Sequence, residues 1–489
     1  MVRALYRFYL YRVFIALLIF IAVALGRLLA TLLPFTPLHS PYDSIPDRSQ
    51  VVQSIAFAIV ALVFAGPLTG LHYWLIRRDM RSDPTAGTSA IRSFFLNMTS
   101  GVGVLLVVPL IGFAVISNRA YNPDVSVIGP TAFAIPTLAL VVLLEMERRR
   151  TQDNTGAALA FERLHLYGVQ IMLLIFLTIA WSYEIRPIID GVFFGGKAAK
   201  ENCTGGYCPS YNLFGLGISL LWFVVAWLSY GWMVKDDKAS YLRLILHYLQ
   251  LAAGVVFLVL GLYRGIEVIL LALFHQAVAL KDVIGPYAWA YDFVSPLTLS
   301  IVVIGTYNGW LRIAAREGLV ERHVLFLTEC TIVAVLAAAV FWWGCGSLLY
   351  YAFQIWTHVS NSPELSTWVS VIASIVVGAG YIGLDIYLWR RDVVEPSLAA
   401  GPRRGLVFAL IGGGILAFAI GGAVALYSWI TALLGSPLNN GQKMINVGLA
   451  AFIVGVCLLG IYLLAALRER LFSRQGKIPT STEPSAPIG

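Results

Sequence analysis

Long apolar runs alternate with short polar segments along the whole chain, and the two follow a repeating order. A basic or polar start precedes an apolar run, a short loop, a second apolar run and a basic stop. This unit recurs six times, at a spacing of roughly 80 residues, which is long enough for two membrane crossings of about 20 residues each. The starts include Arg7, Arg92, Arg163, Arg243, Arg322 and Arg403, and the stops include Arg78, Arg149, Lys235, Arg312, Arg391 and Arg468.

The apolar runs are continuous and lack period-2 alternation, which favours transmembrane helices over the strands of a β-barrel. They predict an all-α integral membrane protein with twelve spans, at about 13–33, 52–76, 93–116, 128–147, 167–190, 212–234, 244–275, 287–311, 324–352, 367–389, 405–434 and 444–467. The spans pair into six tandem hairpins, at 1–83, 84–153, 154–238, 239–318, 319–400 and 401–472. Because each hairpin crosses the membrane twice, all six share one orientation. The pattern leaves open whether the hairpins form a ring or a slab.

Composition excludes a soluble globular protein. The 489 residues are 59% hydrophobic and 12% charged, whereas soluble domains contain about 25% charged residues. The mean hydropathy is +0.79. The net charge of +8 arises at the membrane borders, so we expect a lipid bilayer rather than nucleic acid as the partner.

The placement of Lys and Arg predicts the orientation. Most of these residues lie at the N-terminus, in every second loop and at the C-terminus. The positive-inside rule then places both termini in the cytoplasm. We expect the first span to be a permanent helix rather than a cleaved signal peptide, because it matches the first helices of the later units. We expect residues 473–489, rich in Pro, Ser and Thr, to form a disordered cytoplasmic tail.

The first unit also carries a recognisable pattern. It begins with Tyr-Leu-Tyr-Arg at 9–12 and ends with Gly66-Pro67, His72-Tyr73-Trp74 and Arg77-Arg78. It resembles a family of bacterial multipass membrane proteins catalogued as a domain of unknown function (family 5671). The match is clearest over residues 1–120. The resemblance implies a hairpin-repeat architecture in a bacterial plasma membrane, and it implies no activity.

Ionisable residues inside a membrane are costly and are therefore candidates for function. Four lie near the cytoplasmic ends of the spans: His72, Glu145, Glu329 and Asp385. They could form a proton or cation site at the inner mouth of a cavity. Alternatively, they make interhelical hydrogen bonds and local ion pairs, such as Asp385 with Arg390 or Glu145 with Arg149. Glu329 has apolar neighbours and is the strongest candidate for a titrating carboxyl.

A second charged group lies near the outer face: Arg27, Glu184, Arg186, Arg264 and Glu267. When the units are aligned, Arg27 matches Arg264 and Arg186 matches Glu267. Opposite charges at one depth suggest pairs between neighbouring hairpins. The group could form an outer gate or an anion-attracting vestibule, or it could consist of structural ion pairs and headgroup contacts.

Cys203 and Cys208 lie in an outer loop as Cys-Thr-Gly-Gly-Tyr-Cys. A loop outside the cytoplasm permits a disulfide, and the two glycines permit a tight closure, so we expect these cysteines to be bridged. Two free thiols are the alternative. We expect no metal site in this loop.

The sequence contains no motif that fixes a reaction, such as a phosphate-binding loop, a His-Glu-x-x-His helix or a Gly-x-Ser-x-Gly turn. We therefore expect no catalytic centre and no cofactor. One hypothesis is a permease or channel-like protein for a small solute or ion. A second is a non-transporting scaffold, or a subunit with a membrane-protein partner. A remote third is a haem-binding redox protein, which would use a facing pair among His72, His165, His247 and His323.

Overall fold

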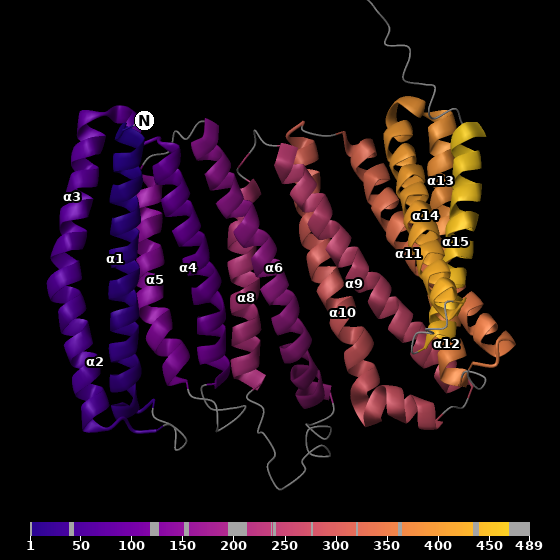
Figure 1. Ribbon diagram of the computed structural model, residues 1–489, viewed down its shortest axis with the longest axis horizontal. Helices are drawn as coiled ribbons and strands as arrows, with labels where there is room; N and C mark the ends of the chain where they lie inside the picture. The colour runs from indigo at the N-terminus through magenta and orange to yellow at the C-terminus, as the bar shows by residue number, and fades with distance from the viewer. Residues whose placement is uncertain are drawn as a thin grey trace, which may run out of the picture. The chain divides into compact units, whose positions relative to one another are not determined.

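The computed structural model describes residues 2–38, 44–117, 127–150, 156–193, 213–235, 237, 241–274, 277–318, 321–359, 364–433 and 440–468. Every regular element in these ranges is a helix (Figure 1). The chain divides into two compact units, Met1–Leu246 and His247–Gly489, so that the boundary falls inside helix α9. The disulfide predicted between Cys203 and Cys208 and the predicted tail lie outside the described residues.

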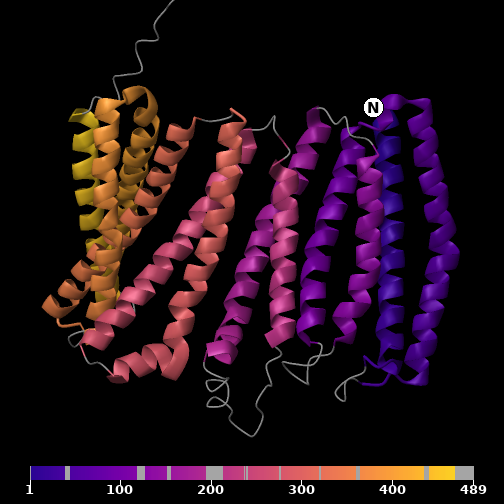
Figure 2. The same cartoon turned by 180° about the vertical axis from the view of Figure 1, so that it is seen from behind.

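The compact unit Met1–Leu246, called the first unit from here on, is built around two central helices. Its elements are α1 (Val2–Leu32), η1 (Leu33–Phe35), α2 (Arg48–Val60), η2 (Ala61–Ala65), α3 (Gly66–Ser82), η3 (Pro84–Ala86), α4 (Ala90–Ser117), α5 (Ile128–Arg149), α6 (Gly156–Phe193), α8 (Leu213–Lys235) and the start of α9 (Tyr241–Leu273). Helix α1 packs on α2, α3, α4 and α5, and helix α4 packs on α5, α6 and α8 (Figure 2). Helices α2 and α3 are joined through a single wider turn, η2, and together form one long span.

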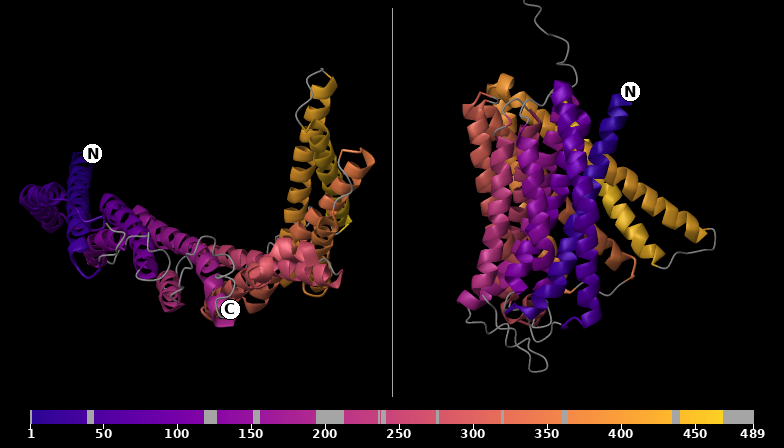
Figure 3. Two further views of the ribbon diagram at one scale, coloured as in Figure 1. Left: turned by 90° about the horizontal axis from the view of Figure 1, so that it is seen from below. Right: turned by 90° about the vertical axis from the view of Figure 1, so that its left-hand side faces the viewer.

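The second unit gathers around α11. It contains the rest of α9, α10 (Ala277–Arg316), α11 (Arg322–Trp356), α12 (Leu365–Gly378), α13 (Gly380–Val394), α14 (Pro396–Leu433) and α15 (Gly441–Arg468). Helix α11 packs on α12, α13, α14 and α15. Helices α14 and α15 lie side by side along their length (Figure 3).

Glycine allows the closest of these approaches. A Cβ atom added at Gly455 of α15 would lie 2.7 Å from the Cα of Phe418 and 2.8 Å from the carbonyl oxygen of Gly414, both on α14. One added at Gly421 would lie 2.7 Å from the carbonyl oxygen of Gly448. The two backbones are therefore in direct contact, as is common where small residues line the interface between membrane helices.

Twelve helices in the described residues are long and apolar enough to cross a membrane. This confirms the predicted all-α polytopic membrane protein. Large apolar side chains are exposed along the spans, including Phe64 at 66% and Trp343 at 74%, and such a surface is suited to contact with lipid. The parallel orientation of six hairpins stays a prediction.

The helices run further than the apolar runs that predicted them. The first span, predicted at 13–33, covers Arg3–Phe35, and the second, predicted at 52–76, covers Arg48–Ser82. Hydropathy falls where the basic flanks begin, but backbone hydrogen bonding continues through arginine, which is a good helix former. The predicted ends therefore mark the edge of the apolar segment rather than the end of the helix.

Candidate functional site

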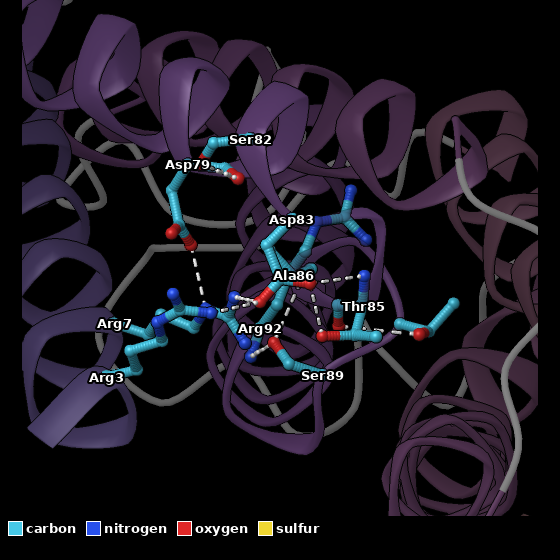
Figure 4. A network of polar contacts seen from close by, with 10 residues as sticks. Arg3, Arg7, Asp79, Ser82, Asp83, Thr85, Ala86, Ser89 and Arg92 are labelled. Atoms are coloured by element: carbon cyan, nitrogen blue, oxygen red, sulfur yellow. Dashed lines mark hydrogen bonds and ion pairs between the residues drawn. The ribbon is translucent and has the colours of Figure 1, made fainter. Parts of the chain in front are cut away.

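Arginines near the starts of α1, α4 and α6 bind carboxylates near the ends of other helices, and we call each such contact an arginine clasp. Arg7 of α1 donates from Nε to Asp79 Oδ2 at 2.7 Å and from Nη2 to Asp83 Oδ2 at 2.7 Å, and Figure 4 shows both carboxylates directed at this guanidinium. Hydrogen bonds from Thr85 and from Arg7 lower the pKa of Asp83 to about 2. The Asp83 carboxylate therefore remains ionised throughout the physiological pH range, so its ion pair with Arg7 stays intact.

Two further arginine clasps follow along the chain. Arg92, at the start of α4, donates to the backbone carbonyl of Glu147 at 2.5 Å and lies 3.5 Å from its carboxylate on α5. Arg163, at the start of α6, binds the Asp237 carboxylate through Nε at 2.9 Å and Nη2 at 3.1 Å. The sequence showed these arginines only as topology signals. The acidic partners lie within a few residues of the basic stops, and this proximity is the sequence signal that could have predicted the ion pairs.

The predicted inner residues are mostly engaged in structural contacts. Glu145 accepts hydrogen bonds from Arg148, at 2.7 and 2.8 Å, and from Arg149 at 2.8 Å, so the expected pair of Glu145 with Arg149 is present. The ring Nδ1 of His72 lies 2.8 Å from the carbonyl oxygen of Leu68.

Asp385 of α13 has a different partner from the expected Arg390. It binds Arg403 of α14, and the Tyr462 hydroxyl of α15 donates to its second oxygen at 3.2 Å. Residues five apart on a helix point to different sides, whereas α14 packs directly on α13.

Glu329 of α11 is half-buried, and its Oε1 is buried without a hydrogen-bond partner among the described residues.

The predicted outer residues whose side chains are described have contacts within their own unit. Glu267 of α9 pairs with Arg264 one turn away on the same helix, at 2.7 Å, and accepts a hydrogen bond from Ser370 of α12. In the first unit the Arg27 guanidinium lies 5.8 Å from the centre of the Phe57 ring. The side chain of Arg186 lies outside the described residues, so its pairing stays a prediction.

One carboxyl near the outer face, Glu184, has a burial and a hydrogen-bonding pattern that its position along the span did not predict. Glu184 of α6 is 5% exposed. Its Oε1 accepts a hydrogen bond from the Ser219 hydroxyl at 3.1 Å, and its Oε2 is buried without a hydrogen-bond partner among the described residues. Burying an isolated carboxylate in apolar surroundings is costly, so this site favours a ligand that supplies a hydrogen-bond donor or a positive charge.

Glu184 lines a pocket of about 580 Å³. The other lining residues are apolar or aromatic: Pro109, Phe113, Phe176, Ile179, Ala180, Tyr183, Leu216 and Phe223. They come from α4, α6 and α8. Phe223 sits over Gly112, where an added Cβ would lie 2.7 Å from its ring, and Trp222 donates to the Val108 carbonyl at 3.0 Å. These contacts fix α8 against α4 and so shape the wall of the pocket.

The second unit has a larger pocket of different chemistry. It measures about 640 Å³ and lies between α11, α14 and α15. Trp342, Trp343, Tyr350 and Tyr351 lie on the α11 side, and Gly, Ala, Val and Leu residues of α14 and α15 form the other side. Its described lining residues include no carboxyl or basic group, so Glu184 distinguishes the first pocket.

No metal centre is evident where side chains can be described. In that part of the chain no group of three or more His, Cys, Asp or Glu residues could hold a metal ion. The His165 Nδ1 lies 2.8 Å from the Asn97 carbonyl oxygen, and the His247 ring packs on Tyr307 and Trp310. The haem hypothesis gains no support from these contacts.

The fold defines a polytopic α-helical membrane protein. Residues 7–119, which cover α1 to α4, match the model of the family described as Domain of unknown function (DUF5671). This confirms the resemblance to that family predicted from residues 1–120, while its bacterial origin and hairpin-repeat architecture stay predictions. No curated protein and no solved structure matches the chain. The match therefore supports this family for the N-terminal segment and indicates no activity.

Proposed function

We propose that this protein is a solute permease of the bacterial plasma membrane, with both termini in the cytoplasm. Its first unit would take up an amphipathic cation with N–H donors in the Glu184 pocket. The observation that carries the proposal is that Oε2 of Glu184 is buried without a described hydrogen-bond partner, on a pocket whose other described lining residues are apolar or aromatic. Ligand sites commonly combine an apolar lining with a few placed polar groups.

The chemistry of the pocket explains the choice of solute. The aromatic and aliphatic walls would bury the apolar body of the molecule. The free carboxyl oxygen would accept a hydrogen bond from its amino group, and loss of the carboxyl proton would provide the opposite charge. A carboxyl that exchanges a proton for a cation couples two fluxes in opposite directions. In the second unit, Glu329 stays a candidate for a further proton site.

A scaffold or complex subunit is the second candidate. The arginine clasps at Arg7, Arg92 and Arg163, together with the paired Glu145, Glu267 and Asp385, support it. Most described intramembrane charges are thus held by partners within their own unit. A scaffold has no need for a buried Glu184 oxygen that lacks a partner among the described residues, which is why we favour the permease.

The test is proton-driven uptake of ethidium, an aromatic cation with amino donors, into inside-out membrane vesicles. We expect Glu184→Gln to lower uptake by roughly tenfold or more, because hydrogen bonds to charged groups contribute about 1.5–3 kcal/mol. Glu162→Gln is the matched control, since Glu162 lies on the same helix but pairs with Arg148 away from the pocket. Equal uptake by wild type and Glu184→Gln, with both proteins inserted normally, would contradict the proposal.

A further inference from the structure

A second, independent feature lies where α3 and α5 end in the first unit. Three arginines surround the single carboxylate of Glu147: Arg92 at 3.5 Å, Arg150 at 3.1 Å and Arg77 at 3.6 Å. The Tyr73 hydroxyl accepts hydrogen bonds from Arg77 at 3.0 Å and from Arg150 at 2.8 Å. One acid therefore faces three bases, and the cluster keeps a surplus of positive charge.

The same cluster borders a pocket. A cavity of about 660 Å³ is lined by Tyr73, Trp74, Arg77, Met80 and Arg81, all on α3. Arg81 is exposed and forms no ion pair or hydrogen bond with any residue that the structure describes. Arg77 thus connects the charge cluster to the pocket, and Arg81 adds a second guanidinium at its rim.

Helix α3 also presents an apolar stripe that leads toward this pocket. Phe64 precedes α3 in η2 and is 66% exposed, and Leu68, Leu71 and Trp74 follow at helical spacing with exposures of 46%, 48% and 54%. The Arg78 guanidinium lies 5.5 Å from the centre of the Trp74 ring. An acyl chain could lie along the stripe while its headgroup reaches the arginines, and Trp and Arg are the residues typical of that boundary.

We infer that this end of α3 and α5 binds the phosphate headgroup of an anionic phospholipid. Guanidinium groups pair with phosphate oxygens through two parallel hydrogen bonds. Basic pockets at membrane helices bind anionic headgroups for this reason. The surplus charge, the pocket and the adjoining apolar stripe favour a lipid over free phosphate, because free phosphate would use only the arginines. The inference does not depend on the proposed transport function.

The test is native mass spectrometry of the full-length protein with added phosphatidylglycerol or phosphatidylcholine. We expect phosphatidylglycerol to bind more tightly, and Arg77→Gln/Arg81→Gln to weaken its binding by roughly tenfold or more, because each interfacial arginine contributes about fivefold. The matched control is Arg390→Gln/Arg391→Gln, which removes the same charge near the end of α13. Neither arginine lines any of the three pockets described above.

Two further arms keep the inference falsifiable. Arg81→Gln alone leaves the Glu147 cluster intact, so it should fold normally and still weaken phosphatidylglycerol binding by about fivefold. Inorganic phosphate in excess should displace little of the lipid. Equal phosphatidylglycerol binding by wild type and Arg81→Gln would overturn the site, and full displacement by inorganic phosphate would overturn its assignment to a lipid.

Discussion

Replacing Arg92 by methionine should destabilise the first unit by about 3–5 kcal/mol, because it removes a buried charge from its hydrogen-bond acceptors. Arg92 is 3% exposed and donates to the backbone carbonyls of Gly87 at 3.2 Å and Glu147 at 2.5 Å. Methionine has a similar length but no donor. Both carbonyls would lose this guanidinium as a hydrogen-bond donor, and the Glu147 carboxylate would lose one of its three arginines.

The measurement is the free energy of unfolding by titration with sodium dodecyl sulfate in mixed micelles. Arg3→Met is the control, since the Arg3 side chain is 83% exposed and lies 3.5 Å from Asp83. Such a surface pair contributes less than about 1 kcal/mol. If the two substitutions had equal effects, the clasp between α4 and α5 would not be a stabilising element.

Replacing Gly455 by valine should separate α14 from α15 and destabilise the second unit by about 3 kcal/mol. The new Cβ would meet backbone atoms, 2.7 Å from the Phe418 Cα and 2.8 Å from the Gly414 oxygen. Backbone atoms cannot turn away as a flexible side chain can. The two helices would have to move apart along an interface that extends over most of their length.

Gly460→Val on the same helix provides the control. A Cβ at Gly460 would meet nothing within 4 Å, so the free energy of unfolding should change by less than about 1 kcal/mol. The same detergent titration compares the two variants. Equal destabilisation would mean that valine acts through helix propensity, and the direct contact between the α14 and α15 backbones would then be contradicted.

The spans could be predicted from sequence because the membrane imposes a local rule. A segment that crosses lipid must be helical and apolar over its own length, so each run of residues reports its own structure. The same locality explains the success with Glu145 and Arg149, which stand four apart on one helix face. It also explains the error with Asp385, whose partner Arg403 lies on another helix.

The Glu184 pocket could not be predicted because it depends on contacts between distant segments. Its walls come from α4, α6 and α8, and the approach of α8 requires Gly112 opposite Phe223. The sequence places both Glu184 and Glu267 near the outer ends of spans, and it does not distinguish them. In the structure Glu267 has Arg264 and Ser370 as partners. What separates the two carboxyls is the absence of a described partner for Glu184 Oε2.

The central claim is that Glu184 presents a carboxyl oxygen, Oε2, with no described hydrogen-bond partner to an apolar pocket within the membrane. Dicyclohexylcarbodiimide tests it directly, because this apolar reagent enters membranes and modifies protonated carboxyls. After treatment of native membranes, mass spectrometry should find Glu184 modified well before Glu147 or Glu267, which are paired with arginines. Ethidium should slow the modification of Glu184. An unmodified Glu184 alongside modified Glu147 or Glu267 would contradict the account.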